Sequence, residues 1–145
     1  MSLFSAISVS ASGMAAQRTR AELLVENLAN AETTRTPEGG PYRRKDAVFA
    51  TDTPEQPFHS LFASHMGADP QGVGVSEIVV DQGDPEQRYL PGHPDADAKV
   101  YVAFPRIHPA EDMVDLMGAA RGYQANVAAI SAVKDMIQRS IDLFR

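Results

Sequence analysis

The residues best suited to acid–base chemistry are Asp95 and Asp97, two carboxylates separated by one residue, with Glu86 shortly before them. A pair of carboxylates can act as general acid and general base when the fold holds both against a substrate. Here the two aspartates alternate in a loop bounded by prolines, and nothing in the sequence positions them. A solvated turn is the favoured interpretation, and we predict that the chain is not an enzyme and has no catalytic residues.

Other reactive arrangements are missing or incomplete. The four histidines (59, 65, 93 and 108) fall in expected loops without the i, i+4 spacing of a helical metal site, and the chain has no cysteine. Gly72 and Gly74 begin a dinucleotide-binding fingerprint, but Glu77 stands where its third glycine belongs. The 13 basic and 19 acidic residues give a net charge of −6, opposite in sign to most nucleic-acid binders. We therefore predict no metal, no cofactor, no small-molecule substrate and no nucleic acid.

Two patterns are better suited to contacts between surfaces. Arg43, Arg44 and Lys45 form the only run of three basic residues, which is either a solvated face or a concentrated patch for an acidic partner. Gly118 and Gly122 stand four residues apart in an expected helix, where each costs up to about 1 kcal/mol relative to alanine. A close approach between two helices would compensate for that cost.

The elements that carry these residues are marked by proline. All ten prolines lie between residues 37 and 109, and proline is excluded from helix interiors, so both ends of the chain are predicted to be helical. Apolar residues at heptad spacing support a coiled-coil-type seam at each end, interrupted only by Arg18 and Lys134. The N-terminal seam comprises Phe4, Ile7, Ala11, Met14, Arg18, Ala21, Val25 and Leu28. The C-terminal seam comprises Met113, Leu116, Ala120, Tyr123, Val127, Ile130, Lys134, Ile137, Ile141 and Phe144.

The predicted fold is α+β, with long N- and C-terminal helices flanking a small, loop-rich β insert. The expected parts are an assembly helix in residues 1–32, the insert in 33–108 and a second assembly helix in 109–145. Within the insert, Val73 to Val80 and the residues from Val100 to Phe104 favour strands, whereas residues 52–72 show no clear pattern.

The sequence leaves the partners of the two seams open. One arrangement is an antiparallel pair of the two helices within the chain. In the other, each seam packs against other chains, because the seams contain small residues and their basic residues, Arg18 and Lys134, could not neutralise each other. We favour the second arrangement, which predicts that the ends become ordered on assembly.

Several stretches resemble a known family. Residues 12–20 lead into Asn27-Leu28-Ala29-Asn30, which resembles the N-terminal signature of bacterial flagellar rod and hook proteins. The stretches 35–45, 91–98 and 111–127 resemble, in order and spacing, the proximal-rod members of that family. Val100 departs from the family pattern, which usually has glycine there, and residues 105–108 depart from it as well.

The resemblance implies a structural subunit of the flagellar basal-body rod that self-assembles through its terminal helices, transmits torque and lines the export channel. Its implied partners are itself, other rod proteins, the membrane ring and the export apparatus. Type III export without a cleaved signal peptide would carry it to the periplasmic rod. Asn30 is expected to end the first helix in the left-handed conformation. Two alternatives stay open: a peptidoglycan-acting enzyme, and a cytoplasmic coiled-coil adaptor that forms a closed dimer.

Overall fold

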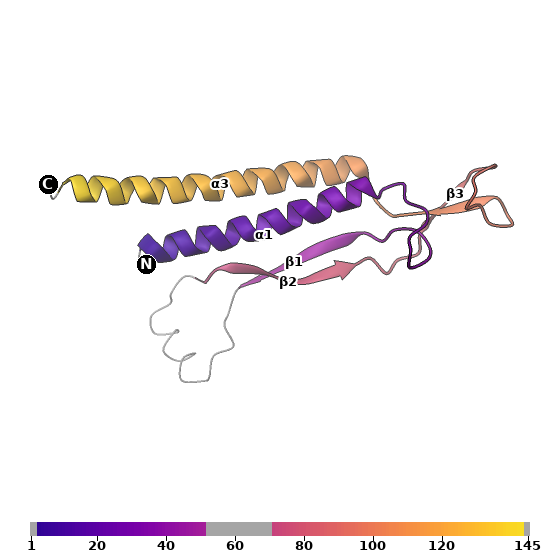
Figure 1. Ribbon diagram of the computed structural model, residues 1–145, viewed down its shortest axis with the longest axis horizontal. Coiled ribbons are helices and arrows are strands. Elements are labelled where there is room, and N and C mark those ends of the chain that lie inside the picture. Colours follow the sequence, from indigo (N-terminus) through magenta and orange to yellow (C-terminus); the bar gives the residue numbers. More distant parts are fainter. Residues whose placement is uncertain (1–2, 52–70, 144–145) are drawn as a thin grey trace, which may run out of the picture.

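Two long helices lie side by side and run in opposite directions in the computed structural model, which describes residues 3–51 and 71–143 (Figure 1). Helix α1 spans Leu3–Ala29 and helix α3 spans Pro109–Asp142. Four strands lie between them in the sequence: β1 (Lys45–Thr51), β2 (Val73–Val80), β3 (Glu86–Tyr89) and β4 (Tyr101–Phe104). The predicted α+β class, with terminal helices flanking a small strand insert, is confirmed.

The strands form two separate antiparallel hairpins, β1–β2 and β3–β4. The first lies along α1 on the side away from α3, so α1 is the middle of three layers (Figure 1). The second lies at the end where α1 finishes and α3 begins. Strand β2 has the predicted bounds and β4 falls within the predicted stretch, whereas β1 and β3 were not predicted. Most of the patternless segment 52–72 lies outside the described residues.

The helix ends follow the sequence signals only in part. Helix α3 begins with Pro109 at its first position and has Glu111 and Asp112 in its first turn, where carboxylates favour the helix dipole. Helix α1 ends differently from the expectation for Asn30. Among the described residues, Val100 is the only non-glycine with positive φ, at 68°, so the predicted left-handed Asn30 is wrong. Instead, the Asn30 side-chain amide donates to the Glu26 carbonyl at 2.9 Å and caps the last turn.

Small and polar residues make the contact between α1 and α3. A Cβ atom added at Gly13 would lie 3.0 Å from the Asn126 amide, and one added at Gly122 would lie 3.2 Å from Gln17. The close helix approach predicted from the glycines is therefore confirmed at Gly122. At Gly118 no described atom lies within 4 Å of the same position. The two helices thus pair within one chain through small and polar residues, whereas the packing of the predicted seams against other chains stays a prediction.

The buried core is modest and contains two polar side chains. Its apolar members are Ala16, Leu23, Leu24, Tyr42, Val102, Phe104, Ile107, Ala119 and Val133. Asn27 and Asp112 are fully buried among the described residues. Burial of a polar group is unfavourable unless its hydrogen bonds are satisfied, so these two side chains must have specific partners. Neither described helix is long and apolar enough to cross a membrane.

Candidate functional site

A groove of about 460 Å³ runs between α1 and α3. Alanine side chains form much of its lining, and the longer side chains stand at its edges. The lining residues are Gln17, Arg18, Ala21, Ala119, Ala120, Tyr123 and Gln124. A concave, largely apolar surface between two helices can accept side chains from a third helix.

The two predicted seams border this groove instead of facing each other. Arg18 and Ala21 of the N-terminal seam line it from α1, and Ala120 and Tyr123 of the C-terminal seam line it from α3. Each seam is rotated away from the helix contact, because the close contact between the helices is made at Gly13 of α1 and Gly122 of α3. The seams are therefore together on one face of the molecule, where both remain partly open to solvent.

Burial varies along both seams. In the N-terminal seam Phe4 (78% exposed), Ala11, Arg18 and Val25 are exposed, whereas Ile7, Met14, Ala21 and Leu28 are half-buried. The C-terminal seam divides in the same way. Its exposed members are Met113 (57%), Ala120, Tyr123, Val127, Lys134 and Ile141, and its half-buried members are Leu116, Ile130 and Ile137. Phe144 lies outside the described residues. The role of these residues in assembly stays a prediction.

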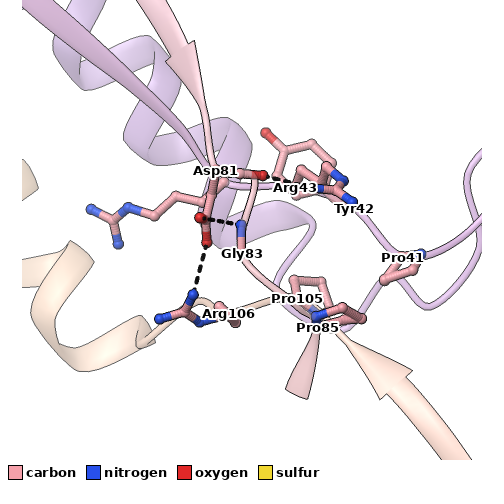
Figure 2. A pocket seen from close by; sticks show the side chains of 9 residues that line it. Pro41, Tyr42, Arg43, Asp81, Gly83, Pro85, Pro105 and Arg106 are labelled. Atoms are coloured by element: carbon pink, nitrogen blue, oxygen red, sulfur yellow. Dashed lines mark hydrogen bonds and ion pairs between the residues drawn. The ribbon is translucent and has the colours of Figure 1, made fainter. Parts of the chain in front are cut away.

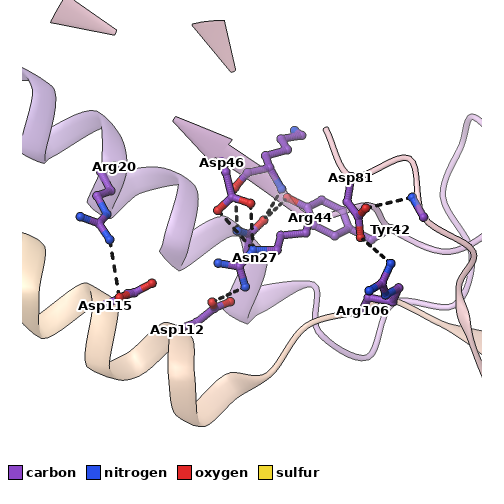
Figure 3. Close-up of polar contacts among 11 residues, drawn as sticks. Arg20, Asn27, Tyr42, Arg44, Asp46, Asp81, Arg106, Asp112 and Asp115 are labelled. Atoms are coloured by element: carbon purple, nitrogen blue, oxygen red, sulfur yellow. Dashed lines mark hydrogen bonds and ion pairs between the residues drawn. The ribbon is translucent and has the colours of Figure 1, made fainter. Parts of the chain in front are cut away.

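A polar junction joins α1, β1 and α3 at the end of the helix pair (Figure 3). At its centre, the Asn27 side chain pairs with the backbone of Lys45. Its Nδ2 donates to the Lys45 carbonyl at 2.9 Å, and its Oδ1 accepts from the Lys45 N–H at 3.0 Å. The Tyr42 hydroxyl also donates to Oδ1, at 3.0 Å. The first asparagine of the family motif thus attaches β1 to α1, while Leu28 is half-buried and Ala29 is exposed.

The phenol of Tyr42 is strongly perturbed by this location. Burial, and then the neighbouring carboxylate of Glu26, raise the pKa of Tyr42 to about 12. Both effects disfavour the phenolate, so Tyr42 stays protonated and keeps donating to Asn27 at neutral pH.

Arg44 connects β1 to the first turn of α3. Its Nη1 donates to Asp112 Oδ1 at 2.6 Å, and its Nε donates to the Asp46 carboxylate at 3.0 Å. The hydrogen bond with Asp46, followed by the charges of Asp46 and Asp112, raises the pKa of Arg44 against the opposing effect of burial. Asp112 Oδ2 is buried without a hydrogen-bond partner among the described residues. Arg44 is therefore the partner that makes the buried Asp112 carboxylate tolerable.

The other basic residues of the run also contact this chain. Lys45 Nζ lies 2.5 Å from Glu26 Oε1, and Arg43 Nη1 donates to the Asp81 carbonyl at 2.9 Å. Within residues 3–51 and 71–143, no carboxylate lies within ion-pair distance of Arg43. Nearby, Arg20 of α1 pairs with Asp115 of α3 at 3.5 Å. Two residues of the run thus hold the fold together, and Arg43 is the member with charge to offer a partner.

A second cavity lies beside the junction but is small, at about 40 Å³ (Figure 2). Arg43 and Arg106 both approach Asp81 there, with 3.8 Å between Arg106 Nη1 and Asp81 Oδ2. The Gly83 N–H donates to Asp81 Oδ1 at 2.9 Å. A space of this size holds a few water molecules at most. Its polar groups join loops; they do not form a substrate site.

The carboxylates considered first for acid–base chemistry serve local structure. Asp95 accepts a hydrogen bond from the Thr34 hydroxyl at 2.8 Å, and Asp97 Oδ1 accepts from the N–H groups of Lys99 and Tyr101. Glu86 pairs with Arg88 at 3.1 Å. In the described part of the chain, no group of three His, Asp or Glu side chains could hold a metal ion.

Comparisons with known proteins decide the family. Residues 105–143 match the family described as "Flagellar basal body rod FlgEFG protein C-terminal". The flagellar basal-body rod protein FlgC of Borreliella burgdorferi is 38% identical, over 100% of this chain and 99% of the relative. FlgC of Bacillus subtilis is 39% identical over 99% of both chains. FlgC of Escherichia coli is 35% identical over 99% of this chain and 98% of the relative.

The chain belongs to the FlgC family. It is a structural subunit of the flagellar basal-body rod, and the predicted relationship to the rod and hook proteins is confirmed. In this FlgC-family chain, sequence reasoning missed the helix contacts of Gln17 and Asn126 and the pairing of Asp112 with Arg44. Gly13 and Gly122 were the available signal for the first two, because each marks a close approach that a polar side chain fills.

Proposed function

We propose that the subunit assembles into the rod through the groove face, meaning the groove together with the two seams that border it. The observation that supports this best is the position of the seams. Large apolar side chains on both helices stay exposed on the face that they share, while small residues are buried between the helices. Contiguous exposed apolar surface of this kind is typical of protein–protein interaction sites.

The same arrangement suggests separate roles for the two terminal helices and for the insert between them. The helices of residues 1–32 and 109–145 would form the tubular wall that surrounds the export channel, and residues 33–108 would lie outside it. Torque would pass from the wall to the insert through the junction of Asn27, Arg44 and Asp112, since it joins α1, β1 and α3. In this role the chain needs no catalysis. Asp95 and Asp97 are engaged by neighbouring loop groups of the described chain, which does not favour the peptidoglycan-acting enzyme.

The proposed partners are further copies of this chain and other rod proteins, with the membrane ring and the export apparatus next to them. Arg43 would contribute charge to one of these contacts, because its guanidinium is exposed and, among the residues that the structure describes, donates only to the Asp81 carbonyl. The relatives carry the name of basal-body rod proteins, which supports the partnership with other rod proteins.

Val127 offers a test of the groove face. Val127→Asp puts a carboxylate on the exposed C-terminal seam, where it will oppose burial against another subunit. Ala128→Asp makes the same change one residue further along the same helix, at an exposed position outside the seam. We expect both variants to fold, with circular dichroism spectra like that of the wild type. Only Val127→Asp should abolish incorporation into purified basal bodies and stop swimming. Normal basal bodies containing Val127→Asp would show that the groove face is not an assembly surface.

A further inference from the structure

The loop between β3 and β4 contains a histidine side chain that accepts a hydrogen bond. The Asp95 N–H donates to His93 Nδ1 at 3.2 Å, and the Ala96 N–H donates to the His93 carbonyl at 3.1 Å. Pro94 stands between His93 and Asp95, and its ring restricts the backbone to conformations that suit such a turn. The imidazole lies beside Phe104 of β4, with 6.4 Å between the ring centroids. A ring nitrogen that accepts a hydrogen bond carries no proton, so this contact requires the neutral imidazole with its hydrogen on Nε2.

Asp95 also joins this loop to the segment that follows α1. Its Oδ2 accepts a hydrogen bond from the Thr34 hydroxyl at 2.8 Å. Thr33, next to it, is fixed to the end of α1, because its N–H donates to the Asn30 carbonyl at 3.1 Å. Asp95 therefore links the β3–β4 loop to α1, and the contact with His93 holds the backbone of Asp95 in place.

The elements around the imidazole carry charged groups of both signs. They are Asp95, Asp97 and Lys99 in its own loop, Glu32 and Arg35 after α1, Glu86 and Arg88 in β3, and His108 before α3. Two of the carboxylates are already engaged, because Asp97 accepts from two backbone N–H groups and Glu86 pairs with Arg88. Arg35 lies 3.9 Å from Asp95 and its side chain is 80% exposed, so it restrains that carboxylate weakly. Asp95 is thus the free-moving carboxylate whose own backbone already touches the ring.

We propose that His93 and Asp95 form a pH-sensitive latch between the β3–β4 loop and the segment after α1. With the imidazole neutral, Nδ1 accepts the Asp95 N–H, and the Asp95 carboxylate accepts from Thr34. Protonation puts a hydrogen on Nδ1, so the Asp95 N–H loses its acceptor. The imidazolium becomes a charged donor for the Asp95 carboxylate, which turns from Thr34 toward the ring and opens the latch. Histidine is the side chain that normally changes charge between about pH 5 and 8, so mild acidification is the signal that opens it.

The helix pair is expected to stay closed when the latch opens. The junction that attaches β1 to α1 and α3 uses Asn27, Arg44 and Asp112, and none of these side chains is a histidine. Acidification from about pH 7.5 to 5.5 therefore loosens the β3–β4 loop and leaves the groove face unchanged. The latch works in the single subunit, so a test on the purified chain is independent of the assembly proposed above.

Amide hydrogen exchange on the purified full-length subunit tests the latch, with protection factors corrected for the intrinsic effect of pH. In the wild type, we expect the protection factor of the Asp95 N–H to fall by about fivefold or more between about pH 7.5 and 5.5. His93→Asn is the matched variant, because its side-chain oxygen can accept in place of Nδ1 and does not titrate. Its Asp95 N–H should stay protected at both pH values. His93→Leu removes the acceptor, so protection of the Asp95 N–H should be low at both.

Two further signals complete the measurement. The Lys45 N–H, which donates to Asn27 Oδ1 at 3.0 Å, is the internal reference and should keep its protection at both pH values. The methyl resonance of Thr34 should shift with pH in the wild type and stay constant in His93→Asn.

Any of five results would overturn the inference. In the wild type these are equal protection of the Asp95 N–H at both pH values, a parallel loss at the Lys45 N–H, and a Thr34 resonance that does not respond to pH. In the variants they are a fall in His93→Asn as large as that of the wild type, and strong protection in His93→Leu at the higher pH.

Discussion

Replacing Arg44 by methionine removes the guanidinium that neutralises Asp112 and keeps much of the apolar length of the side chain. Asp112 is fully buried and its Oδ2 already lacks a described partner, so the carboxylate would lose its one charged contact. Breaking a buried ion pair by removing one member costs about 3–5 kcal/mol. The Arg44 side chain is 21% exposed, and water can replace part of the lost interaction. We therefore expect a loss of about 3 kcal/mol in the free energy of unfolding.

Urea unfolding at pH 7, followed by circular dichroism, measures this loss. Asp112→Asn removes the charge and keeps a polar group, so it should cost less, about 1–2 kcal/mol. The double variant Arg44→Met/Asp112→Leu replaces both partners by apolar groups and should be more stable than Arg44→Met alone by at least about 1 kcal/mol. Two results would refute the reasoning. One is a free energy of unfolding for Arg44→Met within about 0.5 kcal/mol of the wild type. The other is a loss of stability in the double variant equal to the sum of the losses in Arg44→Met and Asp112→Leu measured separately.

Three further outcomes are expected from purified subunits. Gly118→Ala should raise the free energy of unfolding by about 1 kcal/mol, whereas Gly122→Ala should gain less because Gln17 must move; equal gains would contradict the close contact. Val100→Gly should be more stable than Val100→Ala by about 1 kcal/mol, because only glycine adopts a φ of 68° without strain; equal stability would mean that the turn is unstrained. Tyr42 has a raised pKa, so its stabilising contribution is complete below its unfolded value near 10 and is lost as pH rises toward about 12. Unfolding measured across that range should show a shallower fall for Tyr42→Phe than for the wild type, and identical slopes would count against the perturbed phenol.

Elements with a local signal could be predicted from the sequence. Proline placement and heptad spacing indicated both helices, and the last proline, Pro109, coincides with the start of α3. Strand β2 was found because Val73 to Val80 is rich in β-branched residues. Strand β3 carried no such signal, since Glu86–Tyr89 is polar and exposed along its whole length.

The rotation of the helices could not be predicted, because hydrophobic periodicity weighs large side chains most heavily. Met113 and Tyr123 defined the seam in the sequence, but the two helices meet where small residues let their backbones approach. Arg44 and Asp112 are 68 positions apart in the sequence, so no local sequence pattern predicts their ion pair. Only the folded chain shows that a run of basic residues serves mainly to hold its own helices.

The attachment of β1 to α1 through Asn27 has a consequence for how this sequence can vary. Both bonds at residue 45 go to its backbone, so they would form with almost any amino acid there; proline, which has no N–H, is the exception. The side chain at position 45 is therefore not needed to attach the strand to the helix, and here it pairs with Glu26. Asn27 has no such freedom, because only an amide of that length offers a donor and an acceptor together at this depth. Substitutions should therefore accumulate in the strand and be rejected at the helix, although the two residues share one contact.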